Sequence, residues 1–343
     1  MTTHAFERRY DSLRAMVNRR LALLAMTGNS RDLREACRYI LGGGGKRLRA
    51  ILVILGCESA GGSARGALNA AAAVEVLHNF TLVHDDVMDN AVERRGRPTV
   101  HIRWDLNTAL LAGDVLVGIG YRTLLQGGNH GRAAVARAYT EGLIEICEGQ
   151  ALDLSFERRN DVTLPEYFRM IGKKTGALLA AALEIGGLLG NAKPGALAAL
   201  KLFGRHLGIA FQLQDDLLDV VADRNDLGKP IGGDILERKK TYLLLRALQR
   251  TAGEDARFLR RLTGGRNDSP SLLPGKPPDS AAARRRLITT ATAIYRRAGV
   301  LDDARSRIRR TTQLALRALA PLPPSRSKEM LAWLAEKLVS RSS

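Results

Sequence analysis

Two clusters of aspartate hold the residues best suited to chemistry in this chain. The pattern D-D-x-x-D occurs at 85–89 and again at 215–219. On a helix, residues i and i+4 share a face, so the first and last aspartates of a cluster, such as Asp85 and Asp89, point the same way. Their hard oxygens suit Mg²⁺, which binds through one or two carboxylates together with substrate phosphates. Two such clusters could hold several Mg²⁺ ions against one diphosphate.

Each cluster ends an apolar helical pattern, which weakens the simplest alternative. A single acidic cluster could be a solvated helix end. Here the preceding stretches, 74–83 and 207–213, are mostly apolar and of core type. Negative charge at the C-terminal end of a helix also opposes the helix dipole, so the pattern predicts compensating cations near both clusters.

A glycine-rich segment supplies candidate cations. Four glycines at 42–45 precede Lys46 and Arg49. A glycine turn that opens a helix presents backbone N–H groups, and these favour phosphate together with the helix dipole and the basic side chains. The segment lacks the G-x-x-x-x-G-K-[ST] pattern of a P-loop, so it predicts an anion site of another kind.

Further basic and polar residues accompany the clusters. Arg94 and Arg95 follow the first cluster, and paired arginines suit bidentate phosphate binding. His78 lies almost two turns before Asp85 on the same face; a lone histidine is usually a satisfied core residue, but this alignment favours ligand contact. Lys229 lies in a turn, where a solvated lysine is the ordinary interpretation. The other candidates are Lys174, Thr175, Gln212 and Lys239.

This set of residues predicts chemistry on diphosphates without a catalytic triad. The sequence has no G-x-S-x-G pattern, and no cysteine–histidine pair stands out. Aspartates would hold Mg²⁺, the metals and cations would stabilise a departing diphosphate, and apolar helices would line a pocket. The combination indicates ionisation of an allylic diphosphate to a carbocation.

The composition predicts an all-α protein with a basic surface. The chain has 343 residues, 5% aromatics and a net charge of +18 from 53 Lys+Arg against 35 Asp+Glu. Strand-like alternation is scarce and helical periodicity is common. A basic helical nucleic-acid-binding protein would explain the charge but not the two aspartate clusters. No zinc-finger or RNA-binding aromatic pattern is present, so nucleic acid is not expected as a partner.

The elements that position these residues are predicted from periodicity and from glycine and proline breaks. A loop at 90–100 follows the first cluster, and the stretch 263–280 predicts a mobile surface loop before a basic helical region at 281–343. Neither a signal peptide nor a transmembrane segment is expected. The helices are expected at 5–26, 31–41, 46–59, 66–89, 105–127, 131–158, 165–190, 195–222, 237–252 and 281–297.

Three motifs resemble, in order and spacing, those of the trans-isoprenyl diphosphate synthases, or polyprenyl synthetases. The first aspartate-rich region of that family is similar to H-D-D-V-M-D at 84–89 with R-R-G-R-P-T at 94–99. The second is similar to F-Q-L-Q-D-D-L-L-D at 211–219. The family's G-G-K-R-x-R matches the segment at 44–49, although the proline that often follows is Ala50 here.

The resemblance covers roughly residues 30–250 and implies both a fold and a reaction. The fold would be a single-domain helical bundle of residues 1–343 around a deep central cavity, usually in a homodimer. A cytoplasmic location is expected on other grounds, because the sequence shows no signal peptide and its three cysteines lack C-x-x-C spacing. The reaction would be head-to-tail condensation of isopentenyl diphosphate with an allylic diphosphate, supported by about three Mg²⁺ ions. A class I terpene cyclase shares the fold, but it usually carries an Asn/Ser/Glu metal motif second, whereas this chain repeats D-D-x-x-D.

The functional positions of the family carry over to residues of the expected types. The direct Mg²⁺ ligands implied are Asp85, Asp89 and Asp215, supported by Asp86, Asp216 and Asp219. The residues that resemble the allylic-diphosphate contacts are Arg94, Lys174, Gln212, Lys229 and Lys239. Those that resemble the isopentenyl-diphosphate site are Lys46, Arg49, His78 and Arg95. Thr175 and Gln212 would lie near the developing cation.

Residues before the first cluster predict the length of the product. A chain growing beside this helix would meet Thr81 one turn before Asp85, about 6 Å along the axis, and Leu77 two turns before it, about 12 Å. An aromatic residue five positions before the motif, here Phe80, resembles the pattern of geranylgeranyl (C20) synthases. A second aromatic at position 81 would suggest a farnesyl (C15) product, and a longer polyprenyl product is the other alternative. Phe80 falls on the flank of the helix, so an ordinary core role for it stays open.

Overall fold

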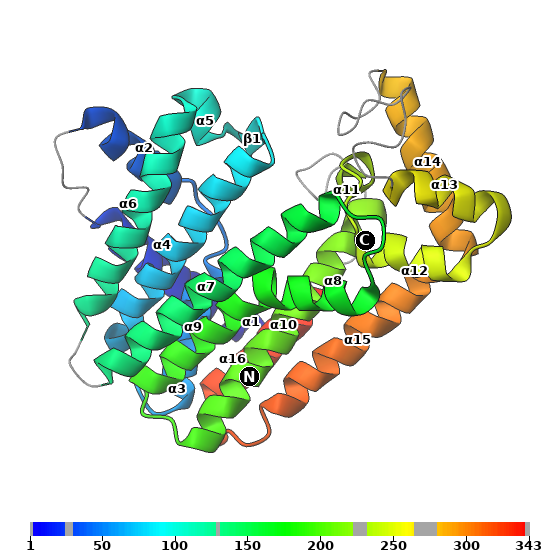
Figure 1. The fold of residues 1–343 in the computed structure, drawn as a ribbon. Coiled ribbons are helices and arrows are strands. Elements are labelled where there is room, and N and C mark those ends of the chain that lie inside the picture. The colour runs from blue at the N-terminus through cyan, green and yellow to red at the C-terminus, as the bar shows by residue number, and fades with distance from the viewer. Residues whose placement is uncertain (1–2, 25–29, 128–130, 222–231, 264–279, 340–343) are drawn as a thin grey trace. The chain divides into compact units, whose positions relative to one another are not determined.

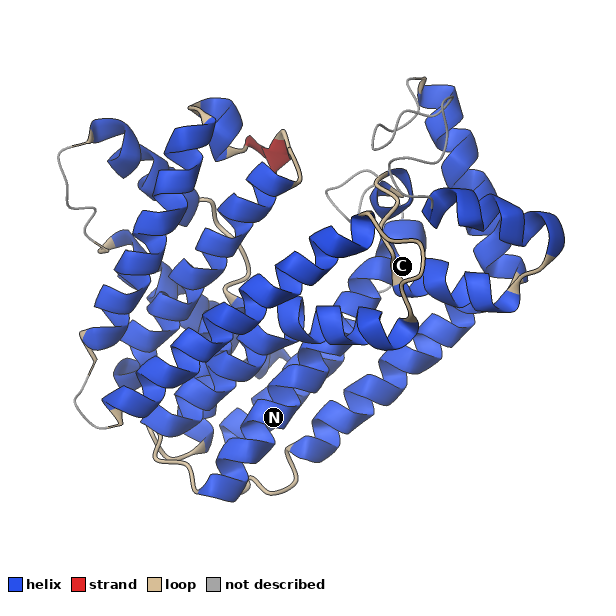
Figure 2. Ribbon diagram, viewed as in Figure 1, coloured by secondary structure: helices blue, strands red, loops and turns tan. Residues whose placement is uncertain are grey.

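The fold is all-α, as the composition predicts (Figure 1, Figure 2). The computed structural model describes residues 3–24, 30–127, 131–221, 232–263 and 280–339. Within these ranges the only strands are β1 (Glu93–Arg94) and β2 (Arg97–Pro98), which pair antiparallel. The predicted fold class is therefore confirmed.

The chain divides into two compact units. Unit 1 comprises Met1–Ile144, Leu178–Gly204 and Leu316–Leu334, and unit 2 comprises Glu145–Ala177, Arg205–Ala315 and Ala335–Ser343. The first aspartate cluster belongs to unit 1 and the second to unit 2. The single-domain organisation and the deep central cavity stay predictions.

In unit 1, helix α4 (Ala64–Met88) carries the first cluster at its C-terminal end. Its start is capped by Ser63, which accepts a hydrogen bond from the backbone N–H of Gly66. Small side chains at 70–73 are buried and let α4 pack closely against α3 (Leu48–Ser59) and α6 (Leu106–Leu125). The other helices of this N-terminal part are α1 (Thr3–Ala22), α2 (Arg31–Leu41) and α5 (Val100–Arg103).

Helix α6 is the one described helix that is long and apolar enough to cross a membrane, with a mean hydropathy of 1.3. Its Ala109, Ala112 and Leu116 are fully buried, and α6 packs extensively against α4. Packing in the core of unit 1 therefore accounts for the apolar composition of this face.

Unit 2 has a core of its own, which includes Tyr167, Leu213 and Leu243. Helix α8 (Leu164–Ile171) begins with a reciprocal capping box between Thr163 and Glu166. The sequence predicts one helix over 165–190, but the structure interrupts it with a π-helical turn, η1 (Gly172–Gly176), before α9 (Ala177–Leu189).

The remaining helices mostly follow the predicted pattern. The expected helix at 281–297 coincides with α14, whereas the expected helix at 237–252 begins only at Tyr242. Residues 264–279 of the predicted mobile loop lie outside the described residues. The bounds are α7 (Arg132–Glu157), α10 (Pro194–Val221), α11 (Gly233–Leu236), α12 (Tyr242–Arg250), α13 (Gly253–Thr263), α14 (Ala281–Arg297), α15 (Val300–Ala318) and α16 (Arg326–Val339).

Candidate active site

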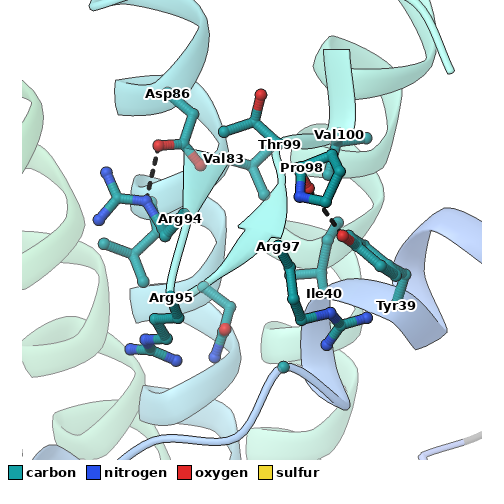
Figure 3. Close-up of a pocket in the computed structure, with 13 residues that line it drawn as sticks. Tyr39, Ile40, Val83, Asp86, Arg94, Arg95, Arg97, Pro98, Thr99 and Val100 are labelled. Carbon is teal, nitrogen blue, oxygen red and sulfur yellow. Dashed lines mark hydrogen bonds and ion pairs between the residues drawn. The ribbon is translucent and has the colours of Figure 1, made fainter. Parts of the chain in front are cut away.

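An open pocket lies beside the first aspartate cluster in unit 1 (Figure 3). Its wall combines α2, α4 and the β1–β2 hairpin. Both basic and apolar side chains reach it, so it can hold an anionic group against an apolar surface. The lining residues are Tyr39, Ile40, Gly43, Asn79, Leu82, Val83, Asp86, Arg94, Arg95, Arg97, Pro98, Thr99 and Val100.

The second aspartate of the first cluster faces this pocket and binds an arginine. Arg94 Nε donates to Asp86 Oδ1 at 2.6 Å, and Asp86 is only 5% exposed (Figure 3). Burial raises the pKa of Asp86, and the charge of Arg94 opposes that rise. Asp86 therefore orients Arg94, while Asp85 and Asp89 lie on another face of the helix end.

The hairpin presents its arginines through a tight turn. Arg95 and Gly96 have positive φ angles of 55° and 73°, which reverse the chain between the two strands. The guanidinium of Arg97 lies over the ring of Tyr39, 3.8 Å from its centroid, and the Tyr39 hydroxyl donates to the Pro98 carbonyl at 2.7 Å. These contacts fix a hairpin that sequence reasoning treats only as a loop.

The glycine segment comes together with the predicted isopentenyl-diphosphate residues. Arg95 Nη1 donates to the Gly44 carbonyl at 2.7 Å, and Arg49 Nη1 lies 3.1 Å from His78 Nε2. Burial lowers the pKa of His78 well below its ordinary value, and the neighbouring Arg49 and Arg95 lower it further. The imidazole is thus neutral, and its Nε2 accepts the bond from Arg49. Lys46 is exposed at the end of the same segment.

In unit 2, the second aspartate of the second cluster is also turned inward. Asp216 is 4% exposed; Tyr167 Oη donates to its Oδ2 at 2.6 Å, and Gln212 Nε2 donates to its Oδ1 at 2.9 Å. The backbone N–H of Tyr242 adds a longer bond of 3.4 Å. Burial raises the pKa of Asp216 to about 6 despite these donors.

The last aspartate of this cluster lies beside another carboxylate. The backbone N–H of Asp234 donates to Asp219 Oδ2 at 3.0 Å. Burial and the charge of Asp234 together raise the pKa of Asp219 to about 7. A divalent cation would relieve this repulsion, so the pair of carboxylates is suited to a metal.

The π-helical turn holds two further predicted residues. Lys174 Nζ lies 2.5 Å from Asp153 Oδ2, and Thr175 Oγ1 donates to Gln212 Oε1 at 2.9 Å. Gly149 on α7 permits this approach, because a Cβ there would lie 2.2 Å from the backbone nitrogen of Lys174. Single π turns inside helices are frequent at functional sites. Thr175, Gln212 and Asp216 therefore form one connected chain of hydrogen bonds.

The donor set fits Mg²⁺ without a preformed cage. Across the described ranges, no group of three His, Cys, Asp or Glu side chains is close enough to hold a metal by itself. Mg²⁺ usually takes one or two carboxylates, several waters and substrate phosphate oxygens, so such a cage is not required. The face-sharing pairs Asp85 with Asp89 and Asp215 with Asp219 supply two carboxylates each.

Two of the predicted chain-length residues, Leu77 and Phe80, are buried on α4, and Thr81 is half-buried. The ring of Phe80 meets the ring of His84 edge-on at a centroid distance of 4.7 Å, and Leu77 is 1% exposed. Thr81 Oγ1 donates to the His78 carbonyl at 2.9 Å. Gly113 on α6 makes room for His84, since a Cβ at Gly113 would fall 2.1 Å from His84 Nε2.

Lys239 lies beside the second cluster: it lines a small pocket with Asp216 and Asp234, and its backbone N–H donates to the Asp234 carbonyl at 2.9 Å. Its charge opposes the rise in the pKa of Asp219, and its Nζ pairs with Glu237 Oε2 at 2.8 Å. The other predicted allylic contact, Lys229, lies outside the described residues. Sequence reasoning also missed Asp153, Tyr167 and Asp234, which bind or face predicted site residues. No spacing rule signals them, because they come from other helices.

Asp219→Asn is expected to stabilise the metal-free protein more at high pH than at low pH. Between pH 4 and 7, roughly, the folded state keeps a proton that the unfolded state releases, so the free energy of unfolding falls as pH rises. Removing this carboxylate should raise the free energy of unfolding by about 2 kcal/mol more at pH 8 than at pH 5. Urea unfolding in EDTA measures the difference. The matched control is Asp11→Asn, at an aspartate whose side chain is 62% exposed. This control should change the free energy of unfolding by the same amount at pH 5 and at pH 8. Equal effects for Asp219→Asn would contradict the prediction.

Known proteins resemble this chain along almost its whole length. The family model for polyprenyl synthetase matches residues 30–273. A short chain isoprenyl diphosphate synthase of Methanothermobacter thermautotrophicus is 38% identical over 310 residues, covering 90% of both proteins. A geranylgeranyl diphosphate synthase of Saccharolobus solfataricus is 37% identical, with 91% of both covered. The crystal structure of a geranylgeranyl pyrophosphate synthetase from Pyrococcus horikoshii Ot3 is 34% identical and matches with a TM-score of 0.87, covering 97% of this chain and 100% of that one.

Proposed function

The chain belongs to the polyprenyl synthetase family and is a trans-isoprenyl diphosphate synthase, and from this premise we propose that it makes mainly geranylgeranyl diphosphate. It would do so by condensing isopentenyl diphosphate head-to-tail with an allylic diphosphate. One observation carries the assignment of the site. In both D-D-x-x-D clusters the second aspartate is buried and hydrogen-bonded, by Arg94 or by Tyr167, which leaves the first and last aspartates on another face.

Product length is tested by a direct assay. The relatives include several named geranylgeranyl diphosphate synthases and one named a (2E,6E)-farnesyl diphosphate synthase, which is 44% identical over 197 residues. Incubation of the protein with isopentenyl diphosphate and C5, C10 or C15 primers, followed by identification of the product, decides between C20, C15 and longer chains. Failure to consume isopentenyl diphosphate with any primer would contradict the function itself and would favour a terpene cyclase.

The proposed mechanism assigns the metal to the aspartates and the diphosphates to the basic residues. Asp85, Asp89 and Asp215 would hold Mg²⁺, with Asp219 in support. When bound, Mg²⁺ supplies stabilisation of the negative charge on the departing diphosphate. About three ions are expected from the resemblance. Asp86 and Asp216 act through the residues that they orient, Arg94 and Gln212.

The chain's own residues then bind and shield the reactants. Arg94 and Lys174 would bind the allylic diphosphate, and Thr175 and Gln212 would lie near the developing carbocation. The alkene of isopentenyl diphosphate attacks the cation, and the released diphosphate takes the proton that is lost. Before isopentenyl diphosphate binds, His78 adds no charge to the site, since burial and the neighbouring arginines hold its pKa well below the ordinary value. Apolar walls exclude water, which would otherwise quench the cation.

Substitutions should separate the two substrates. Lys46→Ala and Arg49→Ala are each expected to raise KM for isopentenyl diphosphate by about one to two decades, because each removes a charge-assisted phosphate contact. KM for the allylic substrate should change little. Lys174→Ala and Lys229→Ala should have the reverse effect. Steady-state kinetics with one substrate saturating measures both values.

A surface lysine provides the control for this division. Lys201 on α10 pairs with Glu184, and its side chain is 47% exposed. Lys201→Ala should leave both KM values unchanged. If Lys46→Ala raised both KM values equally, the division into two diphosphate sites would be wrong.

The homodimer is proposed through helix α6. Opposite its buried face, α6 exposes Leu106 by 52% and Leu111 by 55%, with Leu110 and Leu125 also exposed. Exposed leucines along one helix face mark an interaction surface, and a second copy of the chain is the proposed partner. Light scattering tests the mass in solution, and a monomer at micromolar concentration would contradict the proposal. The cytoplasmic location stays a prediction.

A further inference from the structure

The glycine segment contains a third basic residue that cannot touch a substrate. The sequence G-G-K-R-L-R places Arg47 between Lys46 and Arg49. Lys46 is exposed and Arg49 is partly exposed, but the side chain of Arg47 is only 3% exposed. Arg47 is therefore not a diphosphate ligand.

Arg47 uses its guanidinium to join three parts of unit 1. Nη1 donates to Glu75 Oε1 on α4 at 3.1 Å, Nη2 donates to the Leu41 carbonyl at the end of α2 at 2.9 Å, and Nε donates to Asn18 Oδ1 on α1 at 2.9 Å. The planar guanidinium fixes all three directions at once, which a lysine cannot do. The start of α3 is thus tied to three other helices.

The backbone at Arg47 also needs this support. Arg47 has a φ of 53°, in the left-handed region that non-glycine residues seldom adopt. Two neighbouring carbonyls are also held, because Tyr10 Oη donates to the Lys46 carbonyl at 2.5 Å and Arg95 Nη1 donates to the Gly44 carbonyl. The turn that presents Lys46 and Arg49 is therefore fixed from several sides.

Glu75 connects this turn to the helix that carries the first aspartate cluster. Its side chain is 3% exposed, and its backbone carbonyl accepts a bond from Asn79 Nδ2 at 2.7 Å. Glu75 lies three residues before His78, which itself contacts Arg49. Among the described residues, Glu75 Oε2 has no hydrogen-bond partner. A buried ion pair with an unsatisfied oxygen is a poor source of stability. The fixed geometry that the pair imposes on the turn therefore explains its presence better than a gain in stability does.

We propose that the buried Arg47–Glu75 pair is a positioning device for the isopentenyl-diphosphate site. It sets the turn at 44–47 against α4, so that Lys46, Arg49 and His78 are held in one arrangement before the diphosphate arrives. Holding charged groups in place in advance lowers the entropy lost on binding. This inference rests on the proposed function of the site, and it assigns no direct substrate contact to either residue.

The test replaces the pair without leaving a buried charge. The double variant Arg47→Met/Glu75→Leu puts apolar side chains of similar length in the same space, which buried ion pairs commonly tolerate. Circular dichroism and thermal unfolding establish that it is folded. We expect KM for isopentenyl diphosphate to rise about tenfold or more, with KM for the allylic diphosphate within about twofold of wild type. Arg47→Lys keeps the charge but loses the planar guanidinium with its several donors. It should raise KM for isopentenyl diphosphate by a smaller factor and leave KM for the allylic diphosphate unchanged.

The control is another Arg–Glu ion pair of unit 1, at a more exposed place. Arg9 on α1 pairs with Glu58 on α3 at 2.6 Å, and Arg9→Gln should leave both KM values unchanged. A folded double variant with wild-type KM for isopentenyl diphosphate would overturn the inference, as would loss of the fold in both Arg47 variants. A wild-type protein that consumes no isopentenyl diphosphate would instead contradict the proposed function, so the two failures are distinguishable.

Discussion

Asp85→Ala and Asp215→Ala are each expected to lower kcat by about three orders of magnitude in a protein that stays folded. Each substitution removes a carboxylate oxygen that would hold Mg²⁺ against the leaving diphosphate, and such charge stabilisation acts mainly in the transition state. Both side chains are only partly buried. Because Asp86 and Asp216 are buried and these two aspartates are not, the loss of stability should be smaller than for substitutions at Asp86 or Asp216.

The measurement is turnover at saturating Mg²⁺ and saturating substrates, with circular dichroism to confirm the fold. Asp11→Ala, at an exposed position on α1, serves as the control and should retain wild-type turnover. Near-wild-type kcat in a folded Asp85→Ala or Asp215→Ala protein would exclude the metal assignment. The expected result differs from that of Asp86→Ala, which should also disturb the position of Arg94.

Helix periodicity predicted the main features of the two clusters because those features are local. The i, i+4 spacing places Asp85 with Asp89 whatever surrounds the helix. It also places Asp86 and Asp216 elsewhere on their helices, but it cannot say what they meet there. Their partners, Arg94 and Tyr167, come from a hairpin and another helix, and only tertiary packing brings them within hydrogen-bonding distance.

Departures from the predicted helices also arise from tertiary contacts that the local sequence does not contain. The sequence 165–190 is continuous in apolar pattern, so it predicts one helix, yet contact with Gly149 accompanies a π-helical turn at 172–176. Helix α13 was not predicted, because Gly253 and a short, strongly charged segment resemble a loop. The burial of Arg47 could not be predicted for a related reason. A run of Lys and Arg after glycines suggests an exposed anion site, whereas the buried position of Arg47 depends on its contact with Glu75, which lies 28 residues later.

Phe80→Ala is expected to shift the main product from C20 to longer chains. The ring of Phe80 packs edge-on against His84 and is 9% exposed, so it occupies a defined volume on the flank of α4. If that volume closes the path of the growing chain, its removal lets further condensations proceed before release. Because Phe→Ala in a core typically costs about 3–5 kcal/mol, the milder Phe80→Leu should be examined in parallel and should also lengthen the product.

Thr81→Phe should have the opposite effect and give mainly C15. Position 81 lies one turn before Asp85, about 6 Å along the helix axis, so an added ring would close the path earlier. Thr81→Ser keeps the hydroxyl that donates to the His78 carbonyl and adds no volume, so it should still give C20. Chromatography of the dephosphorylated products measures the distribution in all four variants. An unchanged distribution in folded Phe80→Ala and Phe80→Leu would mean that Phe80 is a core residue and that other helices set the chain length. If only Thr81→Phe changed the product distribution, the path of the growing chain would be closed one turn before Asp85 and not on the flank beside His84.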